Sequence, residues 1–229
     1  MLHEWNLSYA EARRVQVELA GRVEFVPLEK EPQFIAGLDC AFSGDGKRTF
    51  AAAVVLRVIG SHGGQAGQPG RFELEQVETA TAQQETRFPY IPGLLSFREA
   101  PVCLEAVAKL GQPPDLFMID GQGVAHPRRL GLASHLGLFF DRPTIGCAKS
   151  RLIGTFEEPR LIGGLDRAFS GDGEKTFAAA VALRVKPVFV SGDHRCVLED
   201  VIRITLACAA RYRIPEPTRL AHQAVSKLR

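Results

Sequence analysis

Paired metal-binding cysteines, long apolar segments and a strong net charge are all missing from this sequence of 229 residues. Its five cysteines are widely spaced with no Cys-x-x-Cys pair, which excludes the usual zinc sites and predicts reduced, mostly buried thiols. No apolar run approaches the roughly 18 residues of a membrane span and no signal peptide is recognisable, so we expect a cytoplasmic protein without a membrane partner. A formal charge of only +2 does not by itself indicate a nucleic-acid partner.

The composition is that of an ordinary globular protein, with 45% hydrophobic and 24% charged residues. This length suits one domain spanning residues 1–229, and a monomer is the simpler expectation. Ser8 and Glu11 have the spacing of a capping box, which predicts a helix to about Arg22 that packs against the sheet. The glycine-rich segment 60–70 reads as a flexible loop.

Hydrophobic periodicity predicts the remaining elements. Strands are expected at 34–42, 50–58, 72–80, 116–119 and 144–148, with a further one at 188–191. Helices are expected at 94–110, 130–140, 197–211 and 218–228. The order predicts an α/β fold with a ribonuclease H-like mixed sheet, in which three antiparallel strands are followed by parallel strands and flanked by helices.

Residues 161–185 are an internal copy of the hairpin expected at 34–58, displaced by about 127 positions. Both segments contain Ala-Phe-Ser-Gly-Asp-Gly and Thr-Phe-Ala-Ala-Ala-Val. A single duplicated hairpin is not a solenoid, but it can add to a sheet edge where its apolar face matches. Asp166 copies Asp39, yet a copied strand does not copy its surroundings, so we assign Asp166 no catalytic role.

A short apolar segment ends in Asp120 and is followed by Gly121, Gln122 and Gly123. Ligands bind open α/β sheets at the carboxyl ends of their strands, so Asp120 is a candidate site residue. The segments 88–101, 116–137 and 144–151, together with Gly37-Leu38-Asp39, resemble the endonuclease V (deoxyinosine 3′ endonuclease) family over about residues 8–228. The copied segment stands where this family has a different hairpin.

The resemblance implies a catalytic site in which Asp39, Glu99 and Asp120 hold Mg²⁺, for which Mn²⁺ can substitute, since both ions prefer oxygen ligands. It implies that Lys149 contacts the scissile phosphate and that His194 acts on the attacking water. The family usually has a glycine directly before that histidine, where this chain has Asp193.

The resemblance also implies a substrate-binding surface. Tyr90 lies between two prolines on a stiff turn, as suits a wedge that separates strands or fills the space of a displaced base. The residues expected to bind DNA are Pro89, Tyr90, Ile91, Pro92, Gly121, Gln122, Gly123, His126, Leu130, Gly131, Ser134 and Ser150. Several arginines, Arg128 and Arg213 among them, are candidates for phosphate contacts.

The expected function is Mg²⁺-dependent cleavage of DNA containing deoxyinosine, at the phosphodiester bond 3′ to the lesion. Two alternatives stay open. The copied hairpin and Asp193 could leave a nucleic-acid-binding protein with impaired catalysis. Inosine-containing RNA could be the main substrate, because nothing in the sequence decides whether a 2′-hydroxyl is accommodated.

Overall fold

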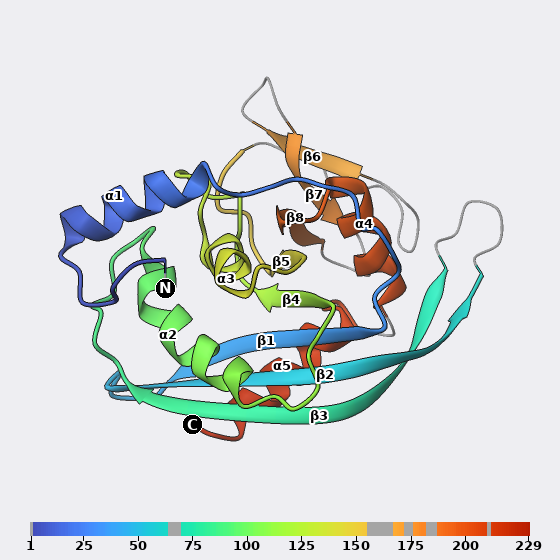
Figure 1. The fold of residues 1–229 in the computed structure, drawn as a ribbon, viewed down its shortest axis with the longest axis horizontal. Coiled ribbons are helices and arrows are strands. Elements are labelled where there is room, and N and C mark those ends of the chain that lie inside the picture. The colour runs from blue at the N-terminus through green and yellow to red at the C-terminus, as the bar shows by residue number, and fades with distance from the viewer. Residues whose placement is uncertain (1, 64–69, 155–166, 172–175, 182–186, 210–211) are drawn as a thin grey trace.

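The computed structural model describes residues 2–63, 70–154, 167–171, 176–181, 187–209 and 212–229 (Figure 1). The described strands are β1 (Phe34–Phe42), β2 (Arg48–His62), β3 (Arg71–Glu85), β4 (Leu116–Asp120), β5 (Thr144–Ala148), β6 (Arg167–Gly171), β7 (Thr176–Val181) and β8 (Val188–His194). The described helices are α1 (Tyr9–Ala20), α2 (Leu95–Ala108), α3 (Leu132–Phe140), α4 (Leu198–Ala207) and α5 (Glu216–Ser226).

The strands form one mixed sheet in the order β3-β2-β1-β4-β5-β8-β7-β6. Strands β1, β2 and β3 are antiparallel, β4 is parallel to β1, and β5 is parallel to β4. This arrangement confirms the predicted fold class. Strand β8 is antiparallel to β5 and extends to His194, three residues beyond the predicted end of this strand.

The capping box at the start of α1 is present, since the Ser8 side chain accepts from the Glu11 N–H and the Glu11 carboxylate accepts from the Ser8 N–H. The expectation that α1 packs against the sheet is wrong. Its buried residue Ala12 packs with Phe88, Leu94 and Phe97, which precede α2 or lie within it. Helix α1 is therefore joined to the segment between β3 and α2.

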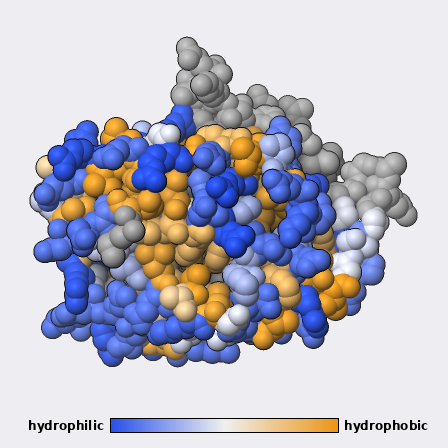
Figure 2. Space-filling view, in the orientation of Figure 1, coloured by the Kyte–Doolittle hydropathy of each residue, from blue (hydrophilic) through white to orange (hydrophobic). Residues whose placement is uncertain are grey.

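The segment predicted as a glycine-rich loop is partly strand, because β2 continues to His62 and pairs with β3 as far as Arg71. Residues 64–69 lie outside the described part of the chain. Figure 2 shows hydrophobic residues gathered in the middle of one face of the molecule, around α1, α2 and α3, with hydrophilic residues at its border. None of the helices in the described ranges is long and apolar enough to cross a membrane.

Alternate residues of β1 face the two helical layers, as the twofold period of a strand requires. Ala36 and Leu38 pack in the cluster that includes residues of α2 and α3, whereas Ile35 packs in the cluster that includes α4. Asp39 has the same parity as Ile35 and contacts α5. The strand therefore directs Asp39 toward α5 and Leu38 toward the opposite layer.

Gly37 explains why α5 lies so close to β1. A Cβ atom at this position would lie 1.9 Å from the carbonyl oxygen of Pro217, far inside van der Waals contact. Only glycine permits this approach. The start of α5 is thereby held against the middle of β1, two residues before Asp39.

The copied segment adds to the sheet as a hairpin. Strands β6 and β7 pair antiparallel, and β7 pairs with β8. Ala179 and Val181 are buried in the cluster that also contains α4. The prediction that the copy can extend a sheet edge is confirmed for these two strands. Asp166 and the rest of 155–166 lie outside the described residues.

Candidate active site

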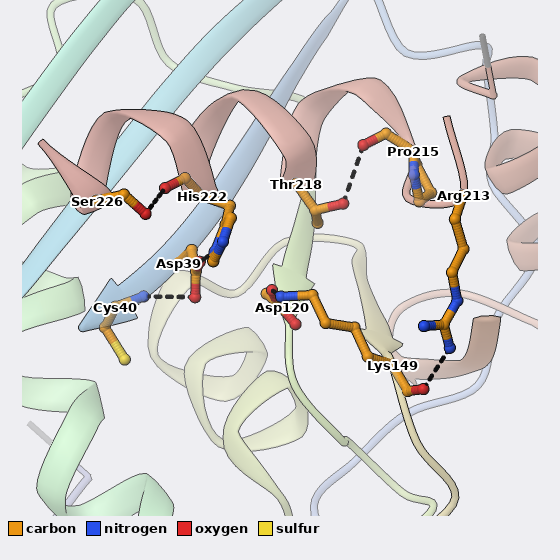
Figure 3. A network of polar contacts seen from close by, with 9 residues as sticks. All are labelled: Asp39, Cys40, Asp120, Lys149, Arg213, Pro215, Thr218, His222 and Ser226. Atoms are coloured by element: carbon orange, nitrogen blue, oxygen red, sulfur yellow. Dashed lines mark hydrogen bonds and ion pairs between the residues drawn. The ribbon is translucent and has the colours of Figure 1, made fainter. Parts of the chain in front are cut away.

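Three side chains from separate elements meet at one edge of the sheet. Asp39 comes from β1, Asp120 from the end of β4, and His222 from α5 (Figure 3). Each offers one possible metal-ligand atom, and these atoms all lie within 4.8 Å of one another. The His222 Nδ1 lies 2.7 Å from the Asp39 Oδ2, and the Asp39 Oδ1 accepts from the Cys40 N–H at 2.8 Å. Among the described residues, Asp39, Asp120 and His222 form the one group of possible metal ligands that lie this close together, and we call this group the acidic cluster.

The topology explains why the two carboxylates meet. Strands β1 and β4 are parallel neighbours in which Leu38 pairs with Ile119, so the next residues, Asp39 and Asp120, lie at the same edge. His222 reaches this edge because α5 packs on β1 and β2. The carboxyl ends of parallel strands are where open α/β sheets usually bind ligands.

Lys149 directly follows β5, whose residue Cys147 pairs with Asp120. Its Nζ lies 2.5 Å from the Asp120 Oδ2. The Arg213 guanidinium donates to the carbonyl oxygen of Lys149 at 2.5 Å and so supports the main chain at the lysine (Figure 3). It also donates to the carbonyl oxygen of Pro187 at 2.9 Å. The structure thus brings the predicted lysine to the acidic cluster.

Glu99, on α2, lines the cavity that also contains Asp39, Asp120 and His222. Its carboxylate oxygens are not among the possible ligand atoms that lie within 4.8 Å of one another. Its side chain is buried, with only 7% of the residue exposed. Burial raises the pKa of Glu99 to about 8; a hydrogen bond with Cys40 opposes this shift, while the charges of Asp39 and Asp120 add to it. The carboxyl of Glu99 therefore holds a proton near neutral pH unless a cation offsets these effects.

The pKa of Asp39 is raised for similar reasons, but by less. Burial, followed by the negative charge of Asp120, raises the pKa of Asp39 to about 6, although His222 and Lys149 oppose the shift. Crowded, buried carboxylates that lack enough positive charge are what a bound divalent cation stabilises. Two carboxylates and an imidazole, with a third carboxylate nearby, form a donor set that fits such an ion.

The acidic cluster forms part of a cavity of about 590 Å³. Tyr90, Ile91 and Pro92 lie on its rim, and the Tyr90 residue is 69% exposed. Pro89 instead faces a neighbouring cavity lined by Trp5. The predicted wedge segment therefore projects beside the acidic cluster.

The loop after Asp120 forms another wall, with Gly121, Gln122, His126 and Gly131 on the cavity surface. The Gln122 Nε2 donates to the Ser150 carbonyl at 2.7 Å, which ties the loop to the residue after Lys149. Burial, with a smaller contribution from Arg128, lowers the pKa of His126 to about 4, so this imidazole is neutral.

Three residues predicted to bind the base lie behind this wall instead of on it. Gly123, Leu130 and Ser134 are buried and do not line the cavity. The Gly131 N–H donates to the Gly123 carbonyl at 2.9 Å. These residues shape the loop from beneath, so their predicted direct contact with the base does not match their positions.

His194 is not brought to the acidic cluster, which corrects the sequence-based expectation. It ends β8 opposite Thr144, the first residue of β5, whereas Cys147, three residues further along β5, pairs with Asp120. The His194 Nδ1 accepts from the Glu24 N–H at 3.3 Å, and its Nε2 lies 3.5 Å from an Asp141 carboxylate oxygen. The histidine at the site is His222, which the sequence analysis missed.

A signal for His222 was present in the sequence. The helix over 218–228 was predicted, and its buried residues Thr218, Ala221 and Val225 define a face directed at the sheet. His222 follows one of these residues and borders that face.

Two of the arginines expected to contact phosphate have guanidinium groups that are engaged within the protein. Arg128 donates to Gln16, and Arg213 donates to the Lys149 carbonyl, so these N–H groups are used inside the protein.

Asp193 stands where the family usually has glycine, and the sequence left open whether it impairs the site. In the structure it is buried and holds the loop that follows Asp120. Its Oδ1 accepts from the Val124 N–H at 2.7 Å, the Ser191 hydroxyl at 2.9 Å and the Ser134 hydroxyl at 3.3 Å. A Cβ atom at Gly123 would lie 1.6 Å from the same oxygen. Asp193 therefore fills the space beneath the loop and does not enter the cavity.

We expect Asp193→Asn to remove a pH dependence of stability. Burial raises the pKa of Asp193 to about 7, above its ordinary value of 3.8. Between these pH values the folded state keeps a proton on Asp193 that the unfolded state has released, so the contribution of Asp193 to wild-type stability falls as pH rises, by about 1.4 kcal/mol per unit. Denaturant unfolding of both proteins between about pH 4 and pH 8 measures this. Parallel stability curves for the two proteins would contradict it.

Known proteins resemble this chain over nearly its whole length. Residues 17–223 match the family model described as Endonuclease V. The chain is 41% identical to the endonuclease V of Nostoc punctiforme, covering 98% of this chain and 96% of the relative. It is 44% identical to that of Methanothrix thermoacetophila, covering 96% and 92%.

Solved structures give the same result. The endonuclease V of Streptomyces avermitilis is 41% identical and superposes with a TM-score of 0.86 over 98% of this chain and 94% of the other. The Ciona intestinalis endonuclease V, solved with a 23mer DNA containing an inosine followed by a ribo-adenosine, is 29% identical, with a TM-score of 0.78 over 96% and 95%. The chain therefore belongs to the endonuclease V family, nucleases that act on phosphodiester bonds.

Proposed function

We propose that this protein is a Mg²⁺-dependent DNA repair endonuclease that recognises deoxyinosine and hydrolyses the phosphodiester bond 3′ to it. The observation that carries the proposal is the meeting of Asp39, Asp120 and His222 beside a cavity with the exposed Tyr90 on its rim. The Ciona intestinalis relative, solved with inosine-containing DNA, supports the substrate class.

In this proposal Asp39, Asp120 and His222 hold the cation, with Glu99 beside them. Carboxylate oxygens favour Mg²⁺, and Mn²⁺ substitutes because it accepts the same ligands. When bound, such an ion neutralises charge on the phosphate and supplies an activated water. Loading the site also keeps Asp39 and Glu99 ionised, which their raised pKa values otherwise oppose.

The protein's own residues then orient the reacting groups. In the neutral tautomer that donates from Nδ1 to Asp39, His222 presents an unprotonated Nε2 that can accept a proton or bind the cation. The Lys149 ammonium, beside Asp120, is placed to stabilise the additional negative charge that develops on the phosphate. His194 has no part in these steps.

Recognition is assigned to the cavity and its rim. Tyr90 projects from a turn stiffened by Pro89 and Pro92 and fills the space left by a displaced base. Gly121, Gln122, His126 and Gly131 form the wall against which the base lies. Ile91 completes the rim, and Ser150 holds Gln122 through its carbonyl oxygen.

The test is cleavage of an end-labelled duplex containing one deoxyinosine, with Mg²⁺, with Mn²⁺ and with EDTA. An identical duplex with deoxyadenosine at that position is the control. We expect a single nick 3′ to the lesion that requires metal and is absent from the control. A nick elsewhere, or one that persists in EDTA, would contradict the mechanism. Binding without a nick would favour a catalytically impaired binding protein.

A second substrate class receives support from the ribo-adenosine that follows the inosine in the Ciona intestinalis complex. A 2′-hydroxyl 3′ to the lesion is thus present in a complex of a relative. The same assay with an inosine-containing RNA strand compares the two substrates. Faster cleavage of the RNA, measured at equal enzyme concentration, would make inosine-containing RNA the main substrate.

A further inference from the structure

Gln16, on α1, is a buried amide that joins two walls of the active-site cavity. The residue is only 1% exposed. Its Nε2 donates to the carbonyl oxygens of Gly93, at 3.0 Å, and Leu130, at 2.5 Å. Its Oε1 accepts from the Arg128 Nε at 2.5 Å. The donor and acceptor atoms of this amide are therefore all used, and they connect three segments that are far apart in sequence.

Arg128 closes the same network. Its second guanidinium nitrogen donates to the Gly93 carbonyl at 2.7 Å, and its main-chain N–H donates to the His126 Nδ1 at 3.1 Å. Gly93 has a φ of +79°, and a Cβ atom there would lie 2.6 Å from the Arg128 guanidinium. Gly93 must therefore be glycine for its carbonyl to receive both donors.

The network connects the wedge segment with the loop after Asp120, which are the two parts of the cavity to which we assign different roles. Gly93 follows the wedge segment that contains Tyr90 and precedes α2, which contains Glu99. Leu130 precedes Gly131, whose N–H donates to Gly123 in the loop after Asp120. The distance between wedge and loop is consequently set by two side chains, Gln16 of α1 and Arg128 of the loop.

We propose that Gln16 is a positioning residue that fixes the wedge relative to the base-binding loop, an inference that rests on the proposed function. It acts when the base is displaced and captured, and it does not touch the acidic cluster or the reacting phosphate. The amide is required because two carbonyls need a donor while Arg128 needs an acceptor. A carboxylate would keep the bond to Arg128 but would face two carbonyl oxygens.

The test is single-turnover cleavage of the deoxyinosine duplex by Gln16→Met, which preserves length and removes all three hydrogen bonds. We expect the enzyme concentration for half-maximal rate to rise about 10-fold, as loss of roughly 1.4 kcal/mol of binding gives, with the maximal rate within about threefold of wild type. Gln16→Glu should behave similarly. A single strand with deoxyinosine, which needs no strand separation, should show a smaller rise.

Gln84→Met is the matched control, because it removes a partly buried amide whose bonds to Pro101 and Glu105 lie away from this cavity. It should leave both kinetic parameters unchanged. An equal fall in maximal rate for both substrates, or unchanged half-saturation in Gln16→Met, would overturn the assignment. If Gln16→Met does not fold, Arg128→Lys, which weakens the bonds to Gln16 and Gly93, serves in its place under the same criteria.

The wild-type arm separates this inference from the function on which it rests. If wild-type protein leaves the duplex uncut with Mg²⁺ and Mn²⁺, the proposed function fails and the role of Gln16 in it fails too. If wild type cuts and Gln16→Met matches it in both parameters, the function stands and only the role of Gln16 is rejected.

Discussion

Asp39→Asn is expected to lower the rate of nicking at deoxyinosine by about 10³-fold or more, because it removes a proposed ligand of a cation that supplies several kcal/mol of transition-state stabilisation. Burial and the charge of Asp120 raise the pKa of Asp39 to about 6, so the ionised side chain is under electrostatic stress in the free protein. Neutral asparagine should therefore leave the folded state as stable as wild type or more so. Single-turnover rates and thermal melting measure the two effects.

Asp166→Asn is the matched control, since residues 161–185 repeat the sequence around Asp39. It should cut at the wild-type rate, because a repeated sequence alone does not bring Asp120 and His222 beside it. Equal losses in the two variants would show that the copied segment contributes to catalysis. Full activity in Asp39→Asn would remove Asp39 from the metal site.

His222→Ala is expected to lower the maximal nicking rate by about 10²-fold, whereas His194→Ala should change it by less than about threefold. The imidazole of His222 lies 2.7 Å from Asp39 within the possible metal cluster. That of His194 is buried near Asp141 and accepts from the Glu24 N–H. Its loss should instead lower the free energy of unfolding by about 1–3 kcal/mol, since the variant removes a buried ring and the hydrogen bond that this ring accepts from Glu24.

Maximal single-turnover rates and urea unfolding of both variants provide the comparison. The pair is matched because each variant removes one imidazole that faces a carboxylate. A strong loss of rate in folded His194→Ala with an active His222→Ala would restore the role that the sequence suggested for His194. Loss in both would indicate that the rate depends on the stability of the sheet.

Much of the fold follows from local sequence. Ser8 and Glu11 satisfy the first turn of α1, and apolar runs bounded by turn residues give β1 and β5 at their predicted bounds. Asp120 was also identifiable, because it ends a buried strand, where open α/β sheets bind ligands. In each of these cases the physical cause lies within a few residues of the position in question. Asp39, inside β1, and Glu99, on α2, were indicated only by the family resemblance.

The choice between the two histidines could not be made in this way. His194 stands in a promising sequence, but strand pairing with Thr144 carries it to the other end of β5. His222 reaches Asp39 across 183 positions because Gly37 lets Pro217 approach β1. Such a contact depends on the packing of a helix against a sheet, which local patterns do not specify.

The copied hairpin shows most directly what sequence determines and what it leaves open. The sequence by itself determined that 34–58 and 161–185 are closely similar and that both favour strands. In the first copy Ala41 pairs with Phe50, whereas its counterpart Ala168 pairs with Ala180, the counterpart of Ala53 and three positions further along. Strand β2 pairs with β3, but β7 pairs with β8. Tertiary structure decided the register, because a strand aligns with the neighbours that bury its side chains.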